Sequence, residues 1–174
     1  MKAFELRYNL FLALIMGMAL ICGCQTDKKD KEVSVLRVHM ESPVINDLTQ
    51  TISVPRDDPV AVVISKDAVL TESSIIAAKV INSPGGFAIQ IQLDENSTWI
   101  LEEYTASNPG RHFAIYGQWG EKGSDGRWLA APLIVHRIAN GILSFTPDMT
   151  REEADRLVLG LNNVAKKNIK GQSK

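Results

Sequence analysis

The feature that most limits what this chain can fold into is an apolar run near its N-terminus, from Leu10 to Cys22. The run has 13 residues, whereas a helix needs about 20 apolar residues to cross a bilayer. Lys2 and Arg7 precede it, and a short apolar run behind a basic start is typical of a secretory signal peptide. The sequence therefore predicts that the protein is exported and that the residues after this run form the folded domain.

The apolar run ends in Ile21-Cys22-Gly23-Cys24. This segment resembles a bacterial lipobox, in which a small residue precedes a cysteine that is acylated and becomes the first residue after cleavage. Gly23 supplies the small residue, so we expect residues 1–23 to be a signal peptide and Cys24 to carry acyl chains such as palmitate. Several acyl chains would hold the protein at a membrane. A plain signal peptide and an uncleaved N-terminal anchor are the alternatives.

Residues 24–32 are polar and charged. Such a segment cannot bury enough apolar surface to order itself, so it is interpreted as a lipid-anchored tether. Both cysteines of the chain, Cys22 and Cys24, lie in the export region. The domain that follows therefore has no cysteine for a disulfide, a thiolate nucleophile or a zinc site. We expect it in the cell envelope, facing the periplasm or the cell exterior.

Size and charge limit the possible partners. Removal of residues 1–23 leaves 151 of the 174 residues, which is enough for one domain with a hydrophobic core. The formal net charge is −1, without the strong positive excess of nucleic-acid-binding proteins. Nucleic acid is therefore not an expected partner.

Residues 33–66 are predicted to form an N-terminal strand region. Residues 34–40 alternate in the pattern of a strand, and residues 51–54 are β-prone. Residues 56–59, Arg-Asp-Asp-Pro, predict a turn. Residues 60–65 are nearly all apolar, as in a central strand.

Residues 67–168 contain clearer signals. Two β-rich runs, 75–82 and 87–93, are joined by Ser83-Pro84-Gly85-Gly86, which predicts a hairpin. A helix capped by Asp94 or Asn96 is expected to begin near Ser97.

Further strands are expected between the two helices. They lie at residues 112–116 and 128–135, and at 138–145 with a turn at Asn140-Gly141. Because a proline cannot donate a ladder hydrogen bond, Pro132 places the 128–135 segment at a sheet edge or at a bulge.

The last element is a helix. Thr150 and Glu153 have the spacing of a capping box, and apolar residues then recur at helical spacing until a basic end near Asn168. The order of strands, helix, strands and helix predicts an α+β fold, with two helices packed on one face of a mostly antiparallel sheet.

Several short segments of residues 67–168 resemble a known family, in the family's order. They are Leu70-Thr71-Glu72, Ala77-Ala78-Lys79-Val80, Ile89 to Leu93, Phe113-Ala114-Ile115, Ala130 to Ile134, Ile138 with Gly141, Phe145-Thr146, and Glu153-Ala154 with Leu157 to Leu161. The series resembles the head subdomain of the first periplasmic domain of SecD (SecDF), and also free-standing envelope lipoproteins that carry only this head domain.

The resemblance implies a domain that binds protein or polypeptide and is linked to protein export. SecD has transmembrane helices and draws on the proton gradient, whereas no apolar run after residue 22 is long enough to span a membrane. The resemblance therefore implies binding rather than translocation.

The sequence shows no sign of catalysis. His39, His112 and His136 lack the spacing of metal ligands, and no Gly-x-Ser-x-Gly nucleophile elbow is present. We therefore expect no enzyme activity, no metal site and no cofactor.

Three residues are candidates for partner binding. Trp119 lies in a glycine-rich tip, residues 117–126, where a large aromatic side chain is difficult to bury, and exposed aromatic residues often anchor a partner. Trp128 and Pro132 lie on the expected sheet edge. In the alternative, the tip folds back and Trp119 covers the sheet.

Three functions remain open. The first is a protein-binding lipoprotein, and the second is a structural or scaffold lipoprotein of the envelope with no role in translocation. The third is an undetected enzyme, which a cleft with convergent polar groups would favour. An exposed apolar patch near Trp119 or along residues 128–135 would favour the first, and a patch-free surface would favour the second.

Overall fold

The computed structural model describes residues 32–54, 59–120 and 123–172. The strands are β1 (Val35–Glu41), β2 (Thr49–Val54), β3 (Val60–Leu70), β4 (Ile75–Ser83), β5 (Gly86–Leu93), β6 (Phe113–Trp119), β7 (Asp125–Ala130) and β8 (Ile142–Phe145). The helices in this part of the chain are η1 (Glu72–Ser74), which is a short 3-10 helix, α3 (Glu95–Ser107) and α4 (Arg151–Gln172). The predicted signal peptide, Cys24 and most of the predicted 56–59 turn lie outside the described residues.

The strands form two antiparallel sheets. One sheet has the order β2-β3-β1-β6-β7 and the other has the order β4-β5-β8. The predicted α+β class with antiparallel pairing is confirmed, but the strands are divided between two sheets rather than placed in one. The division follows from η1, which separates β3 from β4, and from the apolar face of each sheet, because two such faces bury one another.

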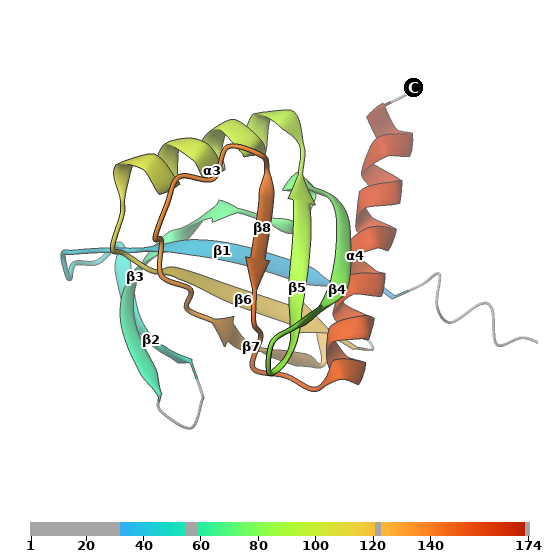
Figure 1. Ribbon diagram of the computed structural model, residues 1–174, viewed down its shortest axis with the longest axis horizontal. Coiled ribbons are helices and arrows are strands. Elements are labelled where there is room, and N and C mark those ends of the chain that lie inside the picture. Colours follow the sequence, from blue (N-terminus) through green and yellow to red (C-terminus); the bar gives the residue numbers. More distant parts are fainter. Residues whose placement is uncertain (1–31, 55–58, 121–122, 173–174) are drawn as a thin grey trace, which may run out of the picture. The chain divides into compact units, whose positions relative to one another are not determined.

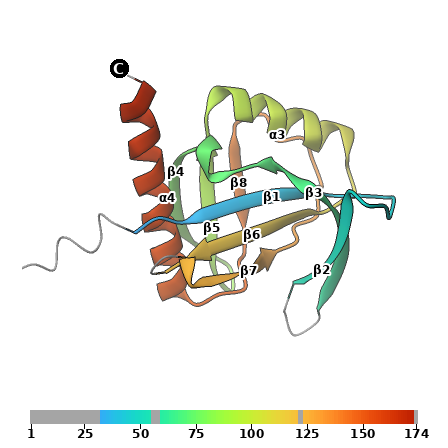
Figure 2. The same cartoon turned by 180° about the vertical axis from the view of Figure 1, so that it is seen from behind.

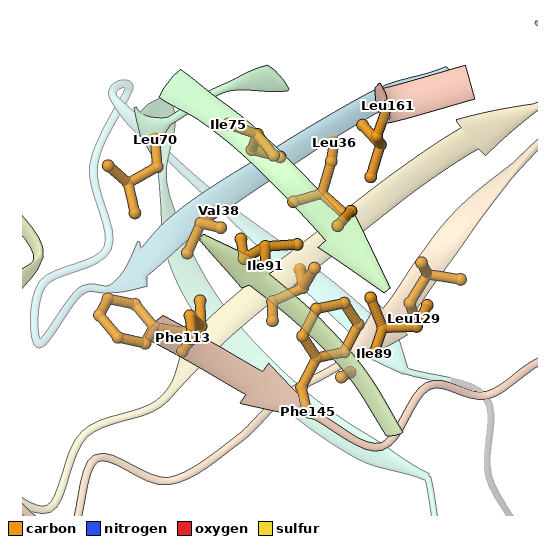
Figure 3. Close-up of a cluster of buried hydrophobic side chains, with 14 of the residues drawn as sticks. Leu36, Val38, Leu70, Ile75, Ile89, Ile91, Phe113, Leu129, Phe145 and Leu161 are labelled. Carbon is orange, nitrogen blue, oxygen red and sulfur yellow. The ribbon is translucent and has the colours of Figure 1, made fainter. Parts of the chain in front are cut away.

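The main core lies between the two sheets, as Figure 3 shows for side chains from both. Ile89 and Ile91 of β5 are fully buried, as is Phe113 of β6. In β5 these apolar side chains alternate with the half-buried Gln90, as predicted for a strand with one face inside. The predicted hairpin is also present, and its turn residue Gly85 has a φ of 81°, a conformation that favours glycine.

The opposite face of the five-stranded sheet carries a second apolar cluster. Its buried members are Ile52, Val54, Val62, Ile64 and Ala114. The half-buried Trp128 and Ala131 pack against it. Because Trp128 belongs to β7, the cluster adjoins this strand.

The strand β3 connects the two regions that we expect from the sequence, residues 33–66 and residues 67–168. It lies between β2 and β1, in agreement with the predicted central position of residues 60–65. It also runs through the expected boundary between residues 66 and 67. The described residues belong to one compact unit, and β3 connects the expected N-terminal strand region with the residues that follow it.

Both helices begin at the predicted caps. The Asp94 carboxylate accepts a hydrogen bond from the Ser97 amide at 2.7 Å. The Thr150 hydroxyl accepts from the Glu153 amide at 3.2 Å, and the Glu153 carboxylate accepts from the Thr150 amide at 2.8 Å, which confirms the capping box. Helix α4 continues to Gln172, beyond the predicted end.

The helices occupy different sides of the sheets. Figures 1 and 2 show α4 alongside β4, with α3 running crosswise near the ends of β5 and β8. Within the described residues, no helix combines the length and the apolar character needed to cross a membrane.

Candidate functional site

β7 is an edge strand of the five-stranded sheet, and the chain continues along that edge after Ala130. The carbonyl of Pro132 accepts a hydrogen bond from the Phe113 amide at 3.0 Å. The Pro132 nitrogen carries no proton to complete the pair. The position of β7 at the end of the strand order agrees with the edge expected for this segment, and Pro132 follows the strand instead of lying within it.

The two residues after Pro132 extend the pairing with the segment that precedes β6. The Ile134 amide donates to the Arg111 carbonyl at 2.8 Å, and Leu133 lies opposite His112 in an antiparallel bridge. In antiparallel pairing, a residue between two hydrogen-bonded positions directs its own N–H and C=O away from its partner. We infer that the backbone groups of Leu133 point toward the open edge.

Two apolar side chains along this edge are exposed. Leu133 is 48% exposed and Val135 is 70% exposed, whereas Ile134 between them is buried. We call residues 128–135 the edge segment. It combines exposed apolar side chains with backbone groups that are directed outward.

Trp128 is fixed at the start of the edge segment by two aromatic neighbours. Its ring makes edge contacts with Tyr116 and with His39, each at 5.4 Å between ring centroids. The His39 ring nitrogen Nδ1 lies 3.0 Å from the Ser65 carbonyl, to which it donates. Burial of the imidazole lowers the pKa of His39. Trp128 is thus half-buried and held in place, with part of its surface accessible to a partner.

Trp119 is fully buried, with 0% exposure. The predicted exposure of this residue is wrong, because β6 extends through Trp119 and pairs it with Asp125 of β7. Its ring lies in the main core with the Arg127 guanidinium 5.1 Å from the ring centroid. Alternation from Phe113 through Ile115 places residue 119 on the same inward face. That alternation was the sequence signal for burial, and in this conformation Trp119 offers no surface to a partner.

A second exposed apolar region was missed by the sequence reasoning. It is the loop between β1 and β2, where Val44 is 55%, Ile45 79% and Leu48 69% exposed. The segment is rich in turn residues, so its apolar members carried no periodic pattern that could have singled them out.

The loop and the edge segment arise at the same end of the five-stranded sheet. Glu41, which ends β1, accepts hydrogen bonds from the His112 amide at 2.7 Å and from its ring nitrogen Nδ1 at 2.8 Å. His112 in turn pairs with Leu133. In Figures 1 and 2 this end of the sheet lies away from α4.

An open depression of about 630 Å³ lies between residues 136–140 and the side chains of β5 and β8. Its polar lining includes Gln90 and Ser144, and the Ser144 hydroxyl is hydrogen-bonded to the Gln90 amide at 3.1 Å rather than to a base. Among the described residues, no group of three or more His, Cys, Asp and Glu side chains is arranged to hold a metal ion. The depression offers hydrogen-bonding groups but no visible catalytic pair.

Comparison with known families gives one match over most of the chain. Residues 48–165 match the family described as SecDF, P1 head subdomain. The matched region begins before the expected residue 67 and includes the whole of β2 and β3. No curated protein matches the chain.

Two solved structures share the fold. One, described as "Structure and function of a membrane component SecDF that enhances protein export", is 18% identical with a TM-score of 0.54, and the alignment covers 82% of this chain and 71% of that chain. The other, described as "Crystal structure of SecDF in Super-membrane-facing form", is also 18% identical, with a TM-score of 0.56 and coverage of 81% and 21%. This chain therefore corresponds to about a fifth of the second SecDF chain.

Proposed function

The chain belongs to the family of SecDF P1 head subdomains, and from this premise we propose that it is an envelope lipoprotein whose head domain binds protein segments in support of protein export. The binding is non-catalytic and uses no cofactor. One solved SecDF structure is described as a membrane component that enhances protein export. Because this chain covers only 21% of another SecDF chain, the proposal assigns binding to it and not translocation.

The observation that supports binding is the edge segment. Leu133 and Val135 expose apolar side chains at an edge where the Leu133 backbone groups are directed outward. An extended polypeptide can add to such an edge as a further strand, with main-chain hydrogen bonds for affinity and alternate side chains for specificity. An unfolded polypeptide exposes its backbone groups and its apolar side chains, so an extended segment of it fits this edge. Trp128 would contribute the accessible part of its ring.

The lipid anchor is proposed at Cys24. Wild-type protein should incorporate labelled palmitate and fractionate with membranes, and Cys24→Ser should do neither. If Cys24→Ser still fractionates with membranes and wild type incorporates no palmitate, the lipoprotein assignment is wrong.

The binding role is tested by photocrosslinking in cells. A photoreactive benzoylphenylalanine replaces Val135 in the full-length chain, and the adducts are identified by mass spectrometry. The matched control places the same residue at Asp155, an exposed position of α4. We expect secretory polypeptides or translocase subunits from position 135 only, and we expect Leu133→Asp to reduce their yield.

The outcomes separate the two functions. Adducts to a single abundant envelope protein would favour a scaffold lipoprotein with no role in translocation. Equal adducts from positions 135 and 155, or none from 135, would count against binding at the edge segment.

A further inference from the structure

The segment that enters β1 is fixed on the surface of α4. The Asn163 side-chain amide donates to the Glu32 carbonyl at 3.0 Å, and the Arg156 Nε lies 3.1 Å from the Glu32 carboxylate. Ser34 is fully buried against Gly160, where there is no room for a Cβ atom. The point at which the chain leaves the domain toward Cys24 is therefore set by α4.

The end of α4 beyond this point is basic. Residues 166–174 contain four lysines and no acidic residue. Lys166 and Lys167 are exposed, and Ile169 beside them is 58% exposed. Lys167 lies one helical turn beyond Asn163, and residues four apart are neighbours on a helix surface. The positive charge is thus adjacent to the place where the tether begins.

A role in stabilising the helix explains only part of this pattern. Cations are favourable near a helix C-terminus because of the helix dipole. That effect does not require an exposed isoleucine among the lysines. Basic residues around an exposed apolar side chain are typical of helices that contact a membrane surface.

The tether length limits how far this helix end can lie from the anchor. Eight residues separate Cys24 from Glu32, and an extended chain spans at most about 3.5 Å per residue, or about 28 Å in all. A bilayer that holds Cys24 therefore lies within reach of the end of α4. Anionic headgroups attract lysines over a distance of about 8 Å at physiological salt.

We propose that the C-terminal end of α4, through Lys166, Lys167 and Ile169, rests on the anionic phospholipid headgroups of the membrane that holds Cys24. The inference rests on the proposed lipid anchor. The contact orients the domain, and it directs Leu133, Val135 and the β1–β2 loop away from the bilayer, because they lie at the end of the five-stranded sheet that is remote from α4 (Figure 1).

The test places benzoylphenylalanine at position 169 of the full-length chain in bacterial cells, with irradiation followed by mass spectrometry of the adducts. The matched control is position 45, where Ile45 is 79% exposed in the β1–β2 loop. We expect phospholipid adducts from position 169 and not from position 45. The double variant Lys166→Glu, Lys167→Glu should lower the yield from position 169 by about tenfold, because each lysine near an anionic surface contributes to the attraction.

The palmitate assay on the same cells separates this inference from the lipoprotein proposal. Acylated, membrane-bound protein that gives no phospholipid adduct at position 169, or equal adducts at 169 and 45, overturns the membrane contact and leaves the anchor intact. Phospholipid adducts at 169 from a chain that is not acylated support the contact and count against the anchor. Protein adducts in place of lipid adducts at 169, or no adduct from a chain that is not acylated, also overturn the contact.

Discussion

The side chain of Asn162 in α4 forms two hydrogen bonds with the backbone of Ala78 in β4. Its carbonyl oxygen accepts from the Ala78 amide at 2.9 Å, and its amide nitrogen donates to the Ala78 carbonyl at 2.9 Å. β4 is an edge strand of the three-stranded sheet. The Asn162 amide thus occupies the place of a peptide group on a neighbouring strand and covers part of that edge, which would otherwise be open to pairing with another chain.

We predict that Asn162→Ala lowers the free energy of unfolding by about 1–3 kcal/mol, because two backbone groups of Ala78 lose their partners. Urea unfolding followed by circular dichroism measures the effect. Asn168→Ala, at an exposed position of the same helix, is the control and should change the free energy little. If the two variants are equally stable, the hydrogen bonds to β4 contribute nothing measurable.

Gly160 is predicted to be essential for the close packing of the N-terminal segment against α4. A Cβ at this position would lie 2.7 Å from the Ser34 backbone nitrogen, a contact that only a shift of the chain can relieve. Gly160→Ala should therefore cost about 1–3 kcal/mol of stability, as overpacking of a tight core does. Gly171→Ala, where an added Cβ would meet no atom within 4 Å apart from its chain neighbours and the backbone of its own helix, should be neutral or stabilising by up to about 1 kcal/mol. Similar changes in the free energy of unfolding for the two variants would contradict the close packing of Ser34 against Gly160.

The elements predicted best from the sequence are those with local signals. The capping box at Thr150 and Glu153, the β4–β5 hairpin and the sheet edge expected for the segment with Pro132 each depend on residues close together in the chain, and each is present. The division into two sheets depends on which apolar faces meet across the core. A single sequence does not contain that long-range pairing. The boundary that we expect between residues 66 and 67 therefore falls inside β3.

In the candidate site, too, local signals were predictable from the sequence and long-range pairing was not. The edge segment was recognised because proline chemistry is local, whereas Trp119 was misplaced because the glycines around it suggested a loop. The ladder between β6 and β7 continues through Trp119 to Asp125, and the buried face of β6 determined its position. The exposed residues Val44, Ile45 and Leu48 had no periodic signal.

Trp119 is predicted to act in stability rather than in binding. Trp119→Ala should cost about 3–5 kcal/mol, as expected for truncation of a buried aromatic residue. Trp119→Phe should cost less than Trp119→Ala, because it leaves a smaller cavity and removes an indole N–H that has no acceptor among the described residues. Urea unfolding followed by far-ultraviolet circular dichroism measures both.

The control for Trp119 is Trp99, which is 70% exposed on α3. Trp99→Ala should change the free energy of unfolding by no more than about 0.5 kcal/mol. A Trp119→Ala variant as stable as Trp99→Ala would show that residue 119 is not in the core.

Acidification is predicted to destabilise the domain in two steps. The first involves His39, whose pKa is lowered below 6.5 mainly by burial, with the nearby charge of Arg37 acting in the same direction and Ser65 and Asp67 opposing it. The second involves Glu153. Partial burial would raise the pKa of this carboxyl, but hydrogen bonds from Arg127 and Thr150 outweigh that effect and lower it below 4.5.

The sign follows from proton binding. Below pH 6.5 the unfolded chain protonates His39 more readily than the folded domain does, so the free energy of unfolding falls as the pH falls. His39→Gln, which keeps a donor for Ser65, should flatten this slope between pH 7.5 and about 5.5. His136→Gln, at an exposed position, is the matched control. Equal slopes for wild type and His39→Gln in urea unfolding at several pH values would show that His39 is not the group responsible.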